Sequence, residues 1–136
     1  MSSDRALLVL RLVSGGVFVA FGAGKFVNHS SELASFKSYG LPAPEAVVVV
    51  VGMVELVGGL LLIAGVLTRP AALVLAGDMV GAIVVSGLAK GELISLTLAP
   101  AELVAMLVLL RMGPGRYVID LRTARSVTIR HGKRLT

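Results

Sequence analysis

Four apolar blocks, each 18 to 22 residues long, constrain the fold of this chain more than any other feature. At about 1.5 Å of rise per residue, a helix of that length crosses the roughly 30 Å hydrocarbon core of a bilayer. A soluble helical bundle would show polar stripes at helical spacing, and Val47–Val54 and Leu56–Leu67 show none. The blocks are Ala6–Gly24, Ala46–Leu67, Ala71–Ala89 and Leu93–Leu110.

The composition agrees with a membrane protein, because 15% of the 136 residues are charged against about 25% in soluble domains. We therefore predict an all-α membrane protein, a bundle of four transmembrane helices. The expected domain covers residues 1–115, with spans at about 6–27, 45–67, 70–89 and 93–112, and a basic cytoplasmic tail follows at 116–136. Arg5 precedes the first block as in a signal peptide, but the block is too long for one and lacks a clear cleavage site.

The distribution of Lys and Arg predicts the topology. Four spans place both termini on one side, and that side with the second connection holds ten Lys and Arg residues against three on the other. By the positive-inside rule both termini are cytoplasmic. We expect a multi-pass protein of the prokaryotic plasma membrane, in contact with the lipid bilayer and with a partner protein or further copies of itself. The same bias explains the basic charge, so we expect no nucleic acid partner.

Three segments leave alternatives open. In the first outer loop, Ser31–Tyr39 fits either a short helix in the membrane interface or an ordinary ordered loop. Pro100 either lies inside the fourth helix or marks its first turn, with a start at Leu98. The tail fits either a β-hairpin, because β-branched residues are enriched, or a basic segment on anionic lipid headgroups.

Three carboxylates lie inside the apolar blocks, at Glu55, Asp78 and Glu102. A charge at such depth costs at least about 2.5–3.5 kcal/mol, so these groups are expected to face a partner or a wet cavity. The first span supplies two cations, Arg11 and Lys25, near one helical face. We expect these five side chains to form a polar intramembrane core, with Arg11 and Glu55 as the first-choice ion pair. Since burial disfavours the charged form, one of the remaining acids should share a proton.

This polar core has two interpretations. Buried ion pairs can fix helix register without any chemistry. Ionisable groups inside a membrane are also candidates for handling protons or ligands. The sequence identifies no catalytic residue.

The sequence also limits the cofactors. It has no Cys, and its two His residues, His29 and His131, fall in a predicted loop and in the tail. No cysteine-held iron–sulfur cluster and no haem held by a His pair between helices is expected. We expect no metal and no covalently bound cofactor, and we expect the isolated chain to have no activity of its own.

Several short stretches together resemble the DoxX/DoxD-like family of small membrane proteins. They follow in family order from Arg11 to Leu121 and are Arg11-x(10)-Gly22-x-x-Lys25, Tyr39–Pro44, Glu55–Leu62 with Gly65 and Thr68-Arg69, and Gly113–Tyr117 with Asp120.

The resemblance implies a four-helix membrane bundle whose polar positions include Arg11, Lys25 and Glu55. Family members are associated with thiosulfate:quinone oxidoreductase and with quinol-oxidising systems. The resemblance therefore implies a non-catalytic subunit or anchor of a quinone-linked oxidoreductase assembly, with quinone as the expected cofactor. Phe18, Phe21 and Gly22 are the candidate quinone or lipid contacts. The alternatives are a small proton-coupled transporter or channel subunit, and an assembly factor for another membrane protein.

Overall fold

The computed structural model describes residues 3–118, and within them every regular element is helical. Four segments are long and apolar enough to cross a membrane, which confirms the predicted all-α, four-span class. The predicted tail hairpin falls on residues outside the described range, apart from Arg116, Tyr117 and Val118. The elements are α1 (Ser3–Val27), α2 (His29–Ser38), α3 (Pro44–Ala64), α4 (Thr68–Ala82), the π-helix η1 (Ile83–Leu88) and α5 (Leu93–Met112).

The distribution of side chains is that of a protein in lipid. Large apolar side chains point outward, as at Val50, Leu73 and Val104, which are about 60% exposed (60%, 59% and 62%). Arg11 is fully buried, and Glu55 is 4% exposed. A soluble bundle would have the reverse arrangement, because water favours polar groups outside. The four spans therefore present their apolar surface to a bilayer.

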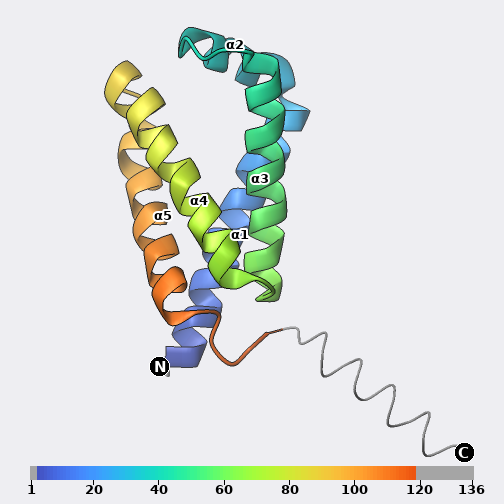
Figure 1. The fold of residues 1–136 in the computed structure, drawn as a ribbon, viewed down its shortest axis with the longest axis vertical. Coiled ribbons are helices and arrows are strands. Elements are labelled where there is room, and N and C mark those ends of the chain that lie inside the picture. The colour runs from blue at the N-terminus through green and yellow to red at the C-terminus, as the bar shows by residue number, and fades with distance from the viewer. Residues whose placement is uncertain (1–2, 119–136) are drawn as a thin grey trace, which may run out of the picture.

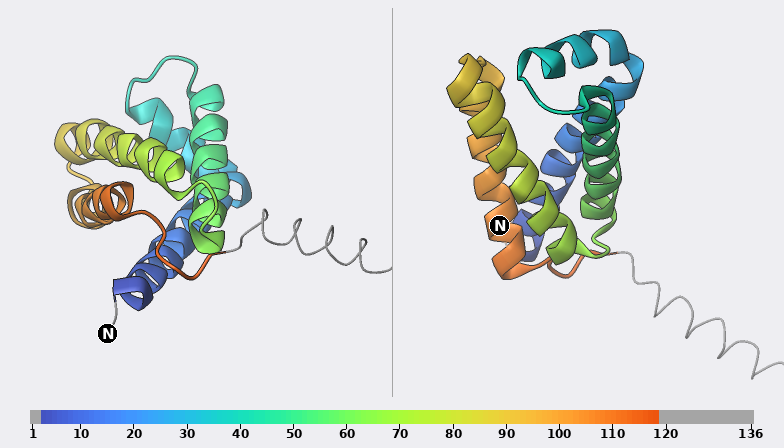
Figure 2. Two further views of the ribbon diagram at one scale, coloured as in Figure 1. Left: turned by 60° about the horizontal axis from the view of Figure 1, so that its bottom comes forward. Right: turned by 45° about the horizontal axis from the view of Figure 1, so that its top comes forward.

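The helices pack as two pairs that converge at one end. Helix α1 packs along α3, and α4 packs along α5, while α1 and α5 touch little. Figures 1 and 2 show the two pairs splaying apart toward the end where α2 lies. At the opposite end, Arg69 at the start of α4 donates to the carbonyl oxygens of Leu110 (3.2 Å) and Arg111 (3.5 Å). The start of α1 and the end of α5 lie at this same end (Figure 1).

Glycines bring α1 and α3 into backbone contact. A Cβ added at Gly22 would lie 2.5 Å from the Leu56 amide nitrogen, and one at Gly59 would lie 2.7 Å from the Gly15 carbonyl oxygen. Small residues at these crossings let two membrane helices approach closely. This contact holds α1 and α3 close together where they cross.

The loop segments resolve two of the open alternatives. A short helix, α2, does form in the connection between the first two spans, at His29–Ser38 rather than at Ser31–Tyr39. Helix α5 starts at Leu93, so Pro100 lies inside it and the alternative start at Leu98 is wrong.

The third span changes to a π-helix over its last six residues. Such wider turns occur often at functional sites.

Candidate functional site

An ion pair between α1 and α3 lies at the centre of the polar core. Lys25 Nζ is 2.8 Å from Glu55 Oε1, and both side chains are almost fully buried. The ammonium also lies over the Phe21 ring, 5.9 Å from its centroid. The predicted Arg11–Glu55 pair is therefore wrong, because Lys25 of α1, and not Arg11, forms the ion pair with the Glu55 carboxylate of α3.

Arg11 instead binds backbone at the other end of the bundle. Its guanidinium donates to the carbonyl oxygens of Leu62, at 3.4 Å, and of Tyr117. Leu62 is near the end of α3, and its carbonyl oxygen also accepts the amide of the C-cap residue Gly65 at 3.2 Å. Arg11 thus joins the end of α3 to the segment after α5, although its Nε has no partner.

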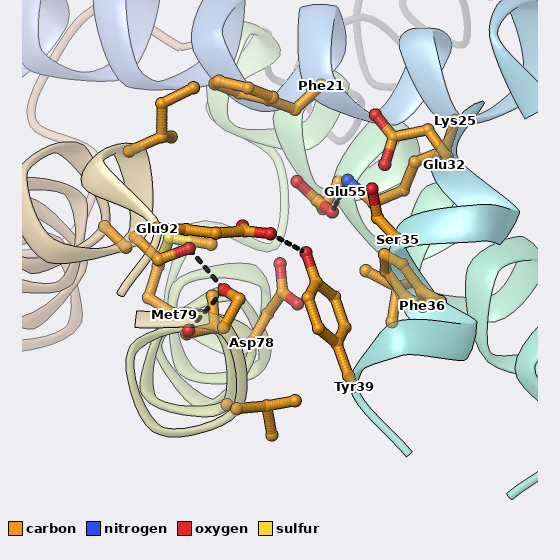
Figure 3. A pocket seen from close by; sticks show the side chains of 18 of the residues that line it. Phe21, Lys25, Glu32, Ser35, Phe36, Tyr39, Glu55, Asp78, Met79 and Glu92 are labelled. Atoms are coloured by element: carbon orange, nitrogen blue, oxygen red, sulfur yellow. Dashed lines mark hydrogen bonds and ion pairs between the residues drawn. The ribbon is translucent and has the colours of Figure 1, made fainter. Parts of the chain in front are cut away.

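A cavity of about 400 Å³ opens between the splayed pairs, in the half of the bundle toward α2. All four spans and α2 contribute to its walls (Figure 3). Aromatic rings line it at Phe18, Phe21, Phe36 and Tyr39, the last two 5.4 Å apart between centroids. Its size is typical of a small-molecule site.

The cavity carries many more acids than bases. One lysine lines it, and that lysine is already paired with Glu55. Five carboxyl groups line it, at Glu32, Glu55, Asp78, Glu92 and Glu102. The site therefore has a large excess of hydrogen-bond acceptors and of negative charge if these groups ionise.

Two carboxyl groups have buried oxygen atoms without a hydrogen-bond partner, Asp78 Oδ2 and Glu102 Oε2. Glu102 is 7% exposed, and the Ser14 hydroxyl lies within hydrogen-bonding reach of its carboxyl group. Asp78 is the tenth residue after the start of α4, and Glu102 the tenth before the end of α5. Both therefore lie about 15 Å from the converging end of these two packed helices. A buried acceptor without a hydrogen-bond partner costs about 1–3 kcal/mol. A ligand group that donates hydrogen bonds to these two oxygen atoms would remove that cost.

A hydrogen bond between Tyr39 and Glu92 crosses the cavity toward its α2 end. The Tyr39 hydroxyl donates to Glu92 Oε1 at 2.7 Å, connecting the end of α2 to the N-cap of α5 (Figure 3). Burial raises the pKa of Tyr39, and the hydrogen bond and charge of Glu92 raise it further. The bond therefore links the two helix pairs on the side where they are farthest apart.

The π-helix sets the remaining polar wall. The Ser86 hydroxyl donates to the carbonyl oxygen of Ala82 at 2.7 Å and lies against the Ser95 hydroxyl of α5. Both serines are buried. Since these hydroxyls bond to each other and to backbone, they hold η1 on α5.

The structure thus gathers most of the candidate residues and separates two of them. Lys25, Glu55, Asp78, Glu102, Phe18 and Phe21 line one cavity. Arg11 lies outside it, and Gly22 is covered by the α3 backbone.

Sequence reasoning missed Glu32, Tyr39 and Glu92. Glu32 lies in α2, and Tyr39 and Glu92 lie in the connections at the same end of the bundle, where polar side chains are expected to face water. The sequence held one sign of Tyr39 and Glu92, since each adjoins a glycine, Gly40 and Gly91, and glycine is common where helices end. Both glycines adopt a positive φ in the structure. Within residues 3–118, no three His, Asp or Glu side chains group as metal ligands do.

Comparison with known proteins places the chain among small membrane proteins. The sequence model of the DoxX family matches residues 6–88, which contain Arg11, Lys25, Glu55 and Asp78. Glu102 and the fourth span lie beyond that match.

Two similar sequences extend the comparison. The chain is 32% identical to the "Uncharacterized membrane protein Rv3486" of Mycobacterium tuberculosis, over 90% of this chain and 84% of that protein. It is 35% identical to the "Putative oxidoreductase CatD" of Bacillus subtilis, over 61% of this chain and 60% of that protein. No solved structure matches the chain.

Proposed function

Because this chain belongs to the DoxX family of membrane proteins, we propose that it is a non-catalytic membrane subunit of a quinone-linked oxidoreductase assembly. The name of the relative from Bacillus subtilis, a putative oxidoreductase, supports this class. The chain has no Cys, so a partner protein would supply the electron carriers.

The cavity is the observation that carries the proposal. Quinone sites combine apolar or aromatic walls with a few polar groups for the carbonyl oxygens. Phe18, Phe21 and Phe36 supply the walls, and Lys25 is the one cation in the lining. With both termini cytoplasmic, as the charge bias predicts, the α2 end of the cavity would lie at the outer face.

Gentle isolation from native membranes tests the proposal. We expect mass spectrometry of the purified protein to find a redox subunit in stoichiometric amount and a retained quinone. In nanodiscs, the protein should bind decylubiquinone, and the double variant Lys25→Met/Glu55→Gln, which leaves no buried charge unpaired, should weaken that binding about tenfold through the loss of one charged hydrogen bond. Lys37→Met is the matched control, because Lys37 is exposed and lies outside the cavity lining. A lone oligomer that holds no quinone and binds none would contradict the proposal.

The acid excess favours a second candidate function, a small proton-coupled transporter. Carboxyl groups inside a membrane are typical of proton relays. Sealed vesicles that contain the protein and a pH-sensitive dye distinguish the two functions. Proton-dependent flux of a solute, abolished by Glu102→Gln, would support transport and count against the subunit role.

A further inference from the structure

The cavity has unmatched acceptors, whereas its lysine, its tyrosine and the Ser86 hydroxyl already donate to other protein groups. Lys25 donates to Glu55, Tyr39 to Glu92, and Ser86 to Ala82. Asp78 Oδ2 and Glu102 Oε2 accept nothing. These two oxygen atoms are therefore available to a ligand that carries hydrogen-bond donors of its own.

The charge balance points in the same direction. Five carboxyl groups and one lysine line the cavity, and three of these acids, Glu55, Asp78 and Glu102, lie within the membrane spans. Negative charge at bilayer depth is costly unless protons or a cation neutralise it. A bound cation would supply both the missing charge and the missing donors.

The shape of the site favours an organic cation over a metal ion. No three acidic or His side chains in the described part of the chain lie close enough together to hold a metal. The walls carry aromatic rings, whose faces attract cations, and Lys25 already lies over Phe21. A cavity of about 400 Å³ also has room for an apolar body beside the charged group.

We propose that the cavity binds a small organic cation, a primary ammonium group on an apolar or aromatic body, with Asp78 and Glu102 accepting its hydrogen bonds. The two acceptors come from the neighbouring helices α4 and α5, at the same distance from the converging end, and both line the cavity. The aromatic side chains hold the body of the ligand toward the α2 end. This site goes beyond the proposed function and does not depend on the identity of the assembly.

The test compares two ligands of nearly the same shape. Titration calorimetry of the protein in nanodiscs, with empty nanodiscs as the blank, measures 2-phenylethylammonium against neutral 2-phenylethanol. We expect the ammonium to bind at least about tenfold more tightly, because charge-assisted hydrogen bonds are worth more than neutral ones. Equal affinities would overturn the proposal without any substitution.

Variants then locate the acceptors. Asp78→Asn and Glu102→Gln preserve the side-chain shape and remove the negative charge, so each should weaken ammonium binding about tenfold. Glu45→Gln is the matched control, since Glu45 is exposed at the start of α3 and lies outside the cavity lining. Circular dichroism verifies that each variant is folded. Unchanged ammonium affinity in both cavity variants would overturn the site.

The decylubiquinone titration separates this proposal from the proposed function. Quinone binding without selective ammonium binding would overturn the cation site and leave the quinone-linked role standing. Ammonium binding without quinone binding would do the opposite.

Discussion

Lys25 and Glu55 connect α1 to α3 through an ion pair of 2.8 Å that is almost fully buried. The pair lies in the wall of the cavity, so the same contact joins α1 to α3 and shapes the site.

Removing one member of the ion pair should destabilise the protein strongly. Lys25→Met leaves the Glu55 carboxylate buried without its cation, a change worth about 3–5 kcal/mol in the free energy of unfolding. The double variant Lys25→Met/Glu55→Gln should recover much of that loss, because no charge is then left unpaired. Unfolding in detergent followed by circular dichroism measures both. A single variant as stable as Lys37→Met would contradict the prediction.

An alanine in the α1–α3 crossing should force the helices apart. The added Cβ in Gly22→Ala would meet the backbone of α3, which cannot move aside as a flexible side chain can. Overpacking of this kind costs about 1–3 kcal/mol. Gly16→Ala is the matched control on the same helix, because nothing lies within 4 Å of its added Cβ. Thermal unfolding should show a lower midpoint for Gly22→Ala and an unchanged midpoint for Gly16→Ala. Equal midpoints in the two variants would argue against the close crossing of α1 and α3.

The planar guanidinium of Arg11 should be irreplaceable by lysine. Arg11 reaches two carbonyl oxygens on separate segments, those of Leu62 and Tyr117, and an ammonium lacks the fork that spans them. Arg11→Lys should cost about 1–3 kcal/mol and speed hydrogen exchange in residues 113–118. Arg111→Lys, at an exposed site, serves as the control. Unchanged exchange in residues 113–118 would show that Arg11 does not hold this segment.

The bond between Tyr39 and Glu92 should persist through neutral pH and weaken only in alkali. Because the folded protein raises the pKa of Tyr39, the stabilisation is complete below the ordinary tyrosine value of about 10 and is lost as pH rises through the higher folded value.

The chain has two tyrosines, so the Tyr117→Phe variant reports Tyr39 alone in an ultraviolet absorbance titration. We expect the Tyr39 hydroxyl to titrate with a midpoint above the ordinary tyrosine pKa. In the double variant Tyr117→Phe/Glu92→Gln, that midpoint should fall back toward the ordinary value. A midpoint at the ordinary value in the single variant would exclude the bond.

The sequence located the polar core better than it located the contacts within it. Glu55 and Lys25 were identified from depth and helical face alone, since a charge in an apolar run has to point inward. The choice of Arg11 as the partner of Glu55 failed because helical periodicity gives a residue's face and says nothing of the tilt between two helices. Tyr39 and Glu92 were missed since their loops are close only when the two helix pairs are in place.

The sequence by itself determined that four helices span a membrane, that their charged residues face inward, and which family the chain resembles. These properties depend on length, hydropathy and local motif, which each segment carries independently of its neighbours. Tertiary structure alone decided that Lys25 pairs with Glu55, that Arg11 binds the end of α3, and that Asp78 and Glu102 line one cavity. Such contacts depend on helix crossings and on the splay of two pairs, which arise from packing between segments far apart in the chain.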